Sequence, residues 1–395
     1  MPPSVNPTTY SIELRDKSGN LKNYLAPFAS NLSWDYKRLG GCGDSRMTIN
    51  KAYRSLEIGS RDDIQIRVKS GATSKLVYRG FIENIISSLK IPQTIAFETR
   101  GYSELLKKIG VQANGDTKTY EDMEISEIVD DIIDTFVTPN SPITKGTIDT
   151  SNFSVDSIQF RGNVYEALQT LAELVGNVEY GVNENLQFFW RTENTSIRER
   201  FFVGDNISIL ERRINYSKLV NKIYLQGGDI EGVPYLRTAE NTDSQVKHYL
   251  AEQILMNSSI ITDTVADQYL GALLRANSDP EINIKVKVNN VALRLEDTVP
   301  IGMISVFDPD YEQSLYKWGT TANGGDNLIW GRTINGGSGK VWGGAYKAQI
   351  DKITYAPSDT DERFNLEIQF GDTILETAAK LNRIEQQLSS LRQRS

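Results

Sequence analysis

The 395-residue chain contains one cysteine, Cys42, and one histidine, His248. One cysteine excludes an intrachain disulfide framework, and the two residues together supply too few ligands for a Cys/His zinc site. A Ser-His-Asp or Cys-His catalytic arrangement would have to use His248, but its run QVKHYLAEQ has no nucleophile elbow and no glycine-rich oxyanion loop. We therefore interpret His248 as a polar partner on a half-buried element. We interpret Cys42, in the run GGCGD, as a small residue in a tight turn.

Long apolar runs and blocks of like charge are absent as well. No apolar run approaches the roughly 18 residues of a membrane-spanning helix, and the first residues, MPPSVNPTTYSIEL, lack a signal-peptide pattern. The formal net charge is −8, and the acidic residues are spread along the chain. An acidic surface has no electrostatic reason to hold phosphate backbones, so we expect no specific nucleic-acid binding.

What the sequence has in abundance is short alternating segments with turn signals between them, the pattern of a β-barrel or sandwich. They occur before and after a more helical central region. The sequence therefore predicts a mainly β fold with an α+β insert. The expected parts are a first β-barrel at 1–101, an α/β middle domain at 102–200, a second β-barrel at 201–371 with an insertion at 316–344, and a C-terminal coiled-coil helix at 372–395.

The clearest local pattern lies in the middle domain. Apolar residues recur at three- and four-residue spacing from Val164 to Val175, which predicts a helix with one buried face. Asn163 can cap its first turn, and Gly176 supplies a left-handed stop. Two short strands joined by a polar turn are then expected at 178–182 and 186–191.

Two further features could suggest chemistry but have simpler interpretations. Asp130, Asp131 and Asp134 could form a metal or acid/base cluster, yet an apolar stripe on the same helix already faces inward, so we interpret them as a solvated face. Gly227-Gly228 follows a strand, and no helix start follows it, so we expect a hairpin turn and no phosphate loop. The Pro/Ser/Thr-rich segment 138–156 is predicted to be a loop.

A short repeat occupies residues 316–344. Its Trp-Gly pairs begin at Trp318, Trp330 and Trp342, twelve residues apart, and Asn-Gly turns lie between them. Each copy is expected to form one tight β-arc. The tryptophans could stack on one another within a glycine-rich extension, which we favour slightly, or contact a partner or a glycan.

The last segment has a heptad pattern with apolar residues at the a and d positions: Ile374, Leu381, Ile384, Leu388 and Leu391. Leucine at a with isoleucine at d favours three or four strands over two. An amphipathic helix packed on its own domain is the alternative. We favour a short coiled coil of oligomerisation residues, because the apolar stripe is narrow.

The two β regions resemble each other near their ends. GFIENIISSL followed by TIAFETRGY has the same order as AYKAQIDKITYAP followed by ERFNLEIQFGD. In each pair, a strand with the pattern Ile-acidic-x-Ile is followed by a polar turn and an alternating strand. We infer that the two β-domains are copies of one fold.

Over most of its length the chain resembles the baseplate hub proteins of tailed bacteriophages, a family also similar to the base of type VI secretion spikes. Five segments carry the resemblance: KLVYRGFIENIISSLKIPQTIAFETRGYSELL, SIQFRGNVYEALQTLAELVGNVEYGVNENLQFFW, RRINYSKLVNKIYLQGG, TDSQVKHYLAEQILMNSSIITDTVADQYLGALL and EINIKVKVNNVALRLEDTVPIGMISVF. The Trp-Gly repeat is a departure from the family pattern.

The resemblance implies a non-enzymatic structural virion protein, assembled in the host cytoplasm, that needs no cofactor or metal. It implies a homotrimer whose six similar barrels adapt the sixfold tail tube to a threefold spike and form part of the DNA exit channel. The implied partners are the tail tube or a distal tail protein on one face and a spike or tail fibre protein on the other.

The alternative is a receptor-binding tail-tip protein that holds cell-surface glycan through Trp318, Trp330 and Trp342. A cell-wall-cleaving enzyme would need a paired carboxylate across a cleft, and no such pair stands out.

Overall fold

The computed structural model describes residues 8–50, 56–59, 61–70, 73–88, 94–113, 116–151, 153–160, 162–176, 178–193, 197–202, 207–230, 233–257, 260, 262–291, 303–313, 341–357 and 364–370. The predicted coiled-coil residues and two of the three repeat tryptophans, Trp318 and Trp330, lie outside these ranges. Trp342 falls within a strand, and only its place in that strand is described.

The first β region is a run of antiparallel strands with the neighbour order β3-β4-β7-β6-β5-β1-β2. Alternation places every second side chain in the core, so that Ile95, Phe97 and Thr99 of β7 are buried. The strands are β1 (Thr8–Arg15), β2 (Leu21–Tyr24), β3 (Ala29–Lys37), β4 (Leu39–Ile49), β5 (Asp63–Ser70), β6 (Thr73–Ser88) and β7 (Thr94–Gly101), with a short 3-10 helix at Ala26–Phe28.

The second β region repeats this arrangement. Its antiparallel neighbour order is β15-β19-β22-β21-β20, which matches β3-β4-β7-β6-β5 both in space and in chain order. The strands are β15 (Ile207–Asn215), β19 (Glu281–Val291), β20 (Met303–Gln313), β21 (Val341–Pro357) and β22 (Phe364–Phe370). The first strand of the region, β14 (Ile197–Phe202), departs from the match, because it pairs parallel with β20 whereas β1 pairs antiparallel with β5.

The correspondence extends to single residues. The β6–β7 ladder skips Glu83, and the β21–β22 ladder skips Asp351. These are the acidic residues of the two Ile-acidic-x-Ile patterns, so each hairpin bulges at the same place. The inferred copying of one five-stranded unit is therefore visible in the register of the structure.

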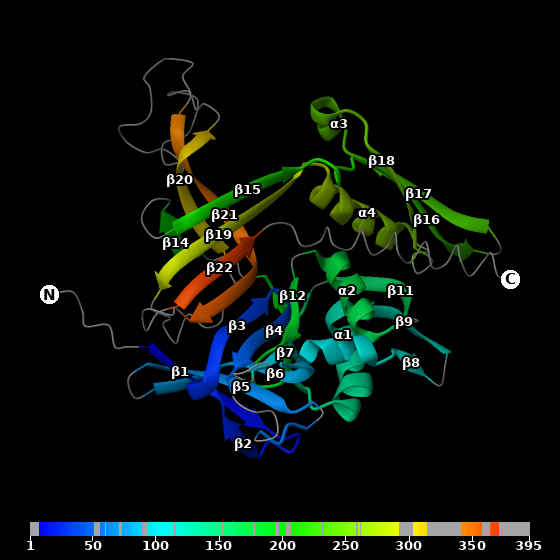
Figure 1. Cartoon of the computed structure of the whole chain (residues 1–395). Coiled ribbons are helices and arrows are strands. Elements are labelled where there is room, and N and C mark those ends of the chain that lie inside the picture. Colours follow the sequence, from blue (N-terminus) through cyan, green and yellow to red (C-terminus); the bar gives the residue numbers. More distant parts are fainter. Residues whose placement is uncertain are drawn as a thin grey trace.

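Both units belong to one sheet. β21 pairs antiparallel with β3, so the strand path runs without interruption from β15 to β2 (Figure 1). The pairings among the described strands form an open, branched path and not a closed ring. The mainly β fold is confirmed, while two closed tandem barrels remain a prediction.

The middle of the chain forms the predicted helix and hairpin. Helix α2 (Val164–Val175) begins after Asn163, whose Oδ1 accepts a hydrogen bond from the backbone N of Glu166 at 2.9 Å, and ends at Gly176 with φ +85°. The hairpin β12 (Val178–Val182) and β13 (Gln187–Thr192) follows. The other elements of this part are η3 (Tyr102–Lys108), β8 (Gln112–Ala113), β9 (Asp116–Glu124), α1 (Ile125–Ile132), η4 (Ile133–Val137), η5 (Thr138–Asn140), β10 (Thr144–Ile148) and β11 (Ser154–Phe160).

The expectation of a loop at 138–156 was wrong. The segment begins with the short 3-10 helix η5, contains β10 and enters β11. β10 pairs parallel with β13 and β11 pairs antiparallel with β9, partners that are distant along the chain. Pairing partners of this kind outweigh the turn preferences of proline and serine.

A β-α insert interrupts the second unit between β15 and β19. Its sheet has the order β17-β16-β18, and its long helix α4 packs on α2 and shares one apolar core with the middle domain (Figure 1). The elements are β16 (Lys222–Ile230), β17 (Val233–Glu240), α3 (Thr242–His248), β18 (Glu252–Met256) and α4 (Asp263–Asn277).

The expectation of a hairpin turn at Gly227-Gly228 was also wrong, because both glycines lie inside β16, where the ladder to β17 shifts register. A side chain at Gly227 would have its Cβ 2.1 Å from the backbone O of Ile260. The glycine therefore allows a close backbone approach and does not reverse the chain.

Candidate functional site

The chemistry-bearing residues of the sequence do not converge on one site. Within the described ranges, no group of three or more His, Cys, Asp or Glu side chains is placed to hold a metal ion. His248 ends α3, with its Nε2 3.5 Å from Oδ1 of Asp279. Cys42 is buried in β4, where burial raises the pKa of its thiol well above the ordinary value. It lies within a strand and not in the expected turn, because the chain reverses between β3 and β4, at Arg38.

The three aspartates of the central helical segment form ion pairs. Lys145 Nζ lies 3.0 Å from Asp130 and 2.6 Å from Asp134, and Lys118 Nζ lies 3.0 Å from Asp131. Their helix turns its apolar side into the core, as the sequence predicts. The interpretation as a solvated face is confirmed.

No helix in the described part of the chain is long and apolar enough to cross a membrane.

The candidate functional site is the junction between the two five-stranded units, where β21 meets β3. Ile353 lies opposite Tyr36, and Tyr355 lies opposite Trp34. The Trp34 and Tyr355 rings stack with centroids 5.5 Å apart and an interplanar angle of 12°. This strand pairing joins the two copies into one continuous surface, and ring stacking adds to it.

Charged side chains reinforce the same junction. Lys352 Nζ lies 2.7 Å from Asp35 Oδ2. At the end of β3, the backbone N of Arg38 donates to Asp351 O at 2.8 Å, and Arg38 Nε donates to Asp351 Oδ1 at 3.1 Å. The same guanidinium reaches Glu193 Oε1 at 2.5 Å. Arg38 is 6% exposed in its side chain, so these charges are desolvated and depend on one another.

Close backbone contact attaches the middle domain to this junction. β12 pairs parallel with the start of β4, with Gly181 opposite Gly40. A Cβ on Gly181 would lie 2.2 Å from the carbonyl carbon of Gly40, and a Cβ on Gly41 would lie 2.3 Å from Val182 O. The Gly-Gly pair of the run GGCGD therefore makes room for another strand.

Two of the strand edges that lack a partner among the described strands lie at the ends of the two five-stranded units, on β15 and β6. β15 pairs with β19 on one side only. β6 pairs with β5 through Thr73–Phe81 and with β7 through Gly80–Ser88. The backbone N of Ile82 also donates to Asp62 O at 2.9 Å, so the edge of β6 opposite β7 is open after Ile82. Unpaired edges expose backbone N–H and C=O groups and can pair with another chain.

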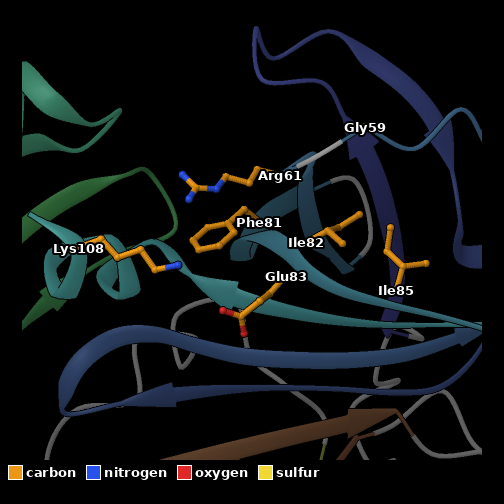
Figure 2. Close-up of a pocket in the computed structure, with 7 residues that line it drawn as sticks. All are labelled: Gly59, Arg61, Phe81, Ile82, Glu83, Ile85 and Lys108. Carbon is orange, nitrogen blue, oxygen red and sulfur yellow. The ribbon is translucent and has the colours of Figure 1, made fainter.

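A cavity of about 240 Å³ lies beside the open edge of β6 (Figure 2). The side chains of Phe81, Glu83 and Lys108 line it, and the Arg61 guanidinium lies over the Phe81 ring, 5.9 Å from its centroid. Glu83 is held by Arg100, whose Nε donates to Glu83 Oε2 at 2.6 Å. The cavity thus combines an aromatic wall with charges of both signs.

The heptad residues Ile374, Leu381, Ile384, Leu388 and Leu391 and the repeat residues Trp318 and Trp330 lie outside the described ranges. Trp342 is described only by its place in β21. The junction residues were missed. The sequence feature that could have located them is the acidic residue shared by the two Ile-acidic-x-Ile patterns, because this residue marks the bulge of each hairpin.

No protein-family model and no curated protein sequence matches the chain. Solved structures do match it. The 43 kDa tail protein of prophage MuSo2 from Shewanella oneidensis is 14% identical over 92% of this chain and 98% of that chain, with a TM-score of 0.59. A tail protein from Neisseria meningitidis MC58 is 10% identical over 92% and 97%, with a TM-score of 0.58. Prophage tail protein gp18 from Listeria monocytogenes EGD-e is 11% identical over 94% and 99%, with a TM-score of 0.54.

These matches cover nearly all of this chain and of each neighbour. The chain therefore has the fold of phage tail proteins, as the resemblance to the tail hub family predicts.

Proposed function

Because the chain folds as phage tail proteins do, we propose that it is a structural tail protein of a phage or phage-derived particle, without catalytic activity. Its role is that of a trimeric baseplate or tail-tip hub. Three chains carry six similar β units, and such a ring adapts a sixfold tail tube to a threefold spike or fibre. The tube or a distal tail protein binds one face and the spike or fibre the other, and the ring surrounds part of the DNA exit channel.

The repeated five-stranded unit is the observation that carries this proposal. Both copies share strand order, strand direction and bulge position, and one edge-to-edge junction already joins them within the chain. An equivalent junction between chains would use the open edges of β6 and β15, which correspond in the repeat to the paired edges of β21 and β3. A head-to-tail contact of this kind closes into a ring when its rotation divides a full turn.

The finer features of the hub belong to the same proposal. Each unit closes into a barrel in the assembled ring, and residues 372–395 form a threefold coiled coil on its axis. The net charge of −8 suits a channel along which DNA passes without adhering. The Trp-Gly repeat at 316–344 is an addition to the hub whose tryptophans stack on one another within a glycine-rich extension; contact with a neighbouring protein or a glycan is the alternative.

Electron microscopy of the purified chain tests the proposal. Views down the ring axis should show six similar lobes, with threefold symmetry because the β-α insert interrupts only the second unit of each chain. Particles of one chain, or rings with another number of lobes, would contradict it. A zymogram on cell-wall material should show no clearing.

A further inference from the structure

The junction inside the chain gives a register for the contact between chains. On β7 and β22, Thr99 and Phe370 occupy equivalent positions, because they lie opposite the residues that precede the two bulges, Ile82 and Ile350. One strand further, Ser45 pairs with Thr99 and Ile284 pairs with Phe370. These pairs define one matched row of residues across the two units.

The alignment reaches the edge strands. Trp34 of β3 pairs with Ser45, and Arg212 of β15 pairs with Ile284, so Trp34 and Arg212 are equivalent. Beyond these residues the β3–β4 ladder shifts register between Trp34 and Tyr36, whereas the β15–β19 ladder has no shift from Arg212 to its end, so the match is continued by counting along β3 and β15 themselves. Four residues onward, Tyr216 stands where the first unit has Arg38. The residue equivalent to Asp351, which Arg38 contacts within the chain, is Glu83.

We propose that a second copy of this chain pairs its β15 with the open edge of β6 and seats its Tyr216 in the cavity beside Glu83. In this register Arg213 of one copy lies opposite Ile86 of the next, as Asp35 lies opposite Thr354 within the chain. The inference rests on the proposed trimer and names the side chains that hold it together.

The chemistry of the two surfaces fits this pairing. Tyr216 is 62% exposed and Ile86 is 59% exposed, so both lie where a partner can cover them. The phenol has an apolar body for the Phe81 wall and a polar end for the carboxylate of Glu83 and the ammonium of Lys108. Tyrosine is enriched among the residues that dominate binding when they fill a pocket of the partner.

Cysteine cross-linking tests the register, since the natural Cys42 is buried. The double variant Arg213→Cys/Ile86→Cys should form covalent trimers on mild oxidation of the full chain. The variant Arg213→Cys/Ser87→Cys is the matched control, because neighbouring strand residues point to opposite faces. Each single variant should stay uncross-linked.

The cavity is tested separately by Tyr216→Ala, which should raise the dissociation constant of the trimer at least about tenfold. Tyr249→Ala, at an 86% exposed tyrosine of the insert, should change it less than about twofold. Two results would overturn this inference and leave the proposed hub intact. One is a trimer that cross-links no better than the control variant, and the other is a trimer dissociation constant that Tyr216→Ala does not change. Absence of any trimer in the wild-type chain would overturn both.

Discussion

Glu83 and Asp351 occupy the same position in two copies of one hairpin, each bulged out of its ladder. The two acidic residues differ in their surroundings. Asp351 is contacted by Arg38 within the chain, whereas Glu83 lies at an open strand edge beside a cavity. One repeated element thus serves once as an internal junction and once as a surface available to a partner.

The internal junction should depend strongly on Arg38. Replacing it with alanine leaves Asp351 and Glu193 without the cation that both contact. We expect Arg38→Ala to lower the free energy of unfolding by about 3 kcal/mol, in the range for one lost partner of a buried ion pair. Urea denaturation measures the change. Arg46→Ala, at a side chain 74% exposed, is the control and should change it by less than about 0.5 kcal/mol.

The contact between the middle domain and β4 should not tolerate a side chain at Gly181. A Cβ there would lie 2.2 Å from backbone atoms of Gly40 and Gly41, which can yield only if a strand moves. Gly181→Ala should therefore destabilise the chain by roughly 1–3 kcal/mol. Gly110→Ala is the matched control, since the nearest atom to its added Cβ is 4.0 Å away. Equal unfolding midpoints in urea for the two variants would refute the close approach.

Asp44 should make part of the stability dependent on pH. Burial raises its pKa, but Lys37 and Arg100 outweigh that effect and hold the pKa below the ordinary value. A carboxyl whose pKa is lower in the folded state stabilises the fold above its unfolded pKa of about 3.9, and this contribution disappears as the pH falls through the folded value. Asp44→Asn should therefore cost roughly 1 kcal/mol at neutral pH and almost nothing at the acid end. Urea titrations of both proteins over this range measure the difference, and a cost that is constant with pH would exclude the ion pairs as its source.

The single thiol should be unreactive in the folded chain. Cys42 is buried and burial raises its pKa, so the thiolate that reacts with alkylating reagents is scarce at neutral pH. A colorimetric thiol reagent should detect one group per chain in urea and almost none without it. Ser18→Cys, placed in an exposed turn, should add one fast-reacting group. Fast reaction of the unmodified folded chain would contradict the burial of Cys42.

The sequence predicts an element correctly where residues close together along the chain determine its structure. Helix α2 begins after Asn163 and ends at Gly176 as predicted, because a cap and a left-handed glycine act within one turn of the helix ends. The apolar stripe of α1 also predicts its buried face.

The elements that could not be predicted from the sequence are strands whose hydrogen-bonded partners lie far away along the chain. β10 was missed because its stabilising partner, β13, lies far along the chain, and β16 contains the Gly-Gly pair mistaken for a turn. The junction of β21 with β3 has no local signature either. The repeated Ile-acidic-x-Ile pattern indicated that two distant hairpins are copies of one another, but it did not indicate that β21 pairs with β3.

The mass of the full chain in solution, measured by light scattering over a concentration series, tests the hub most directly. A trimeric ring predicts a species of three times the 44.3 kDa chain mass, which persists or weakens in a version ending at Gly371. A full-length chain that keeps the mass of one chain at every concentration would contradict it.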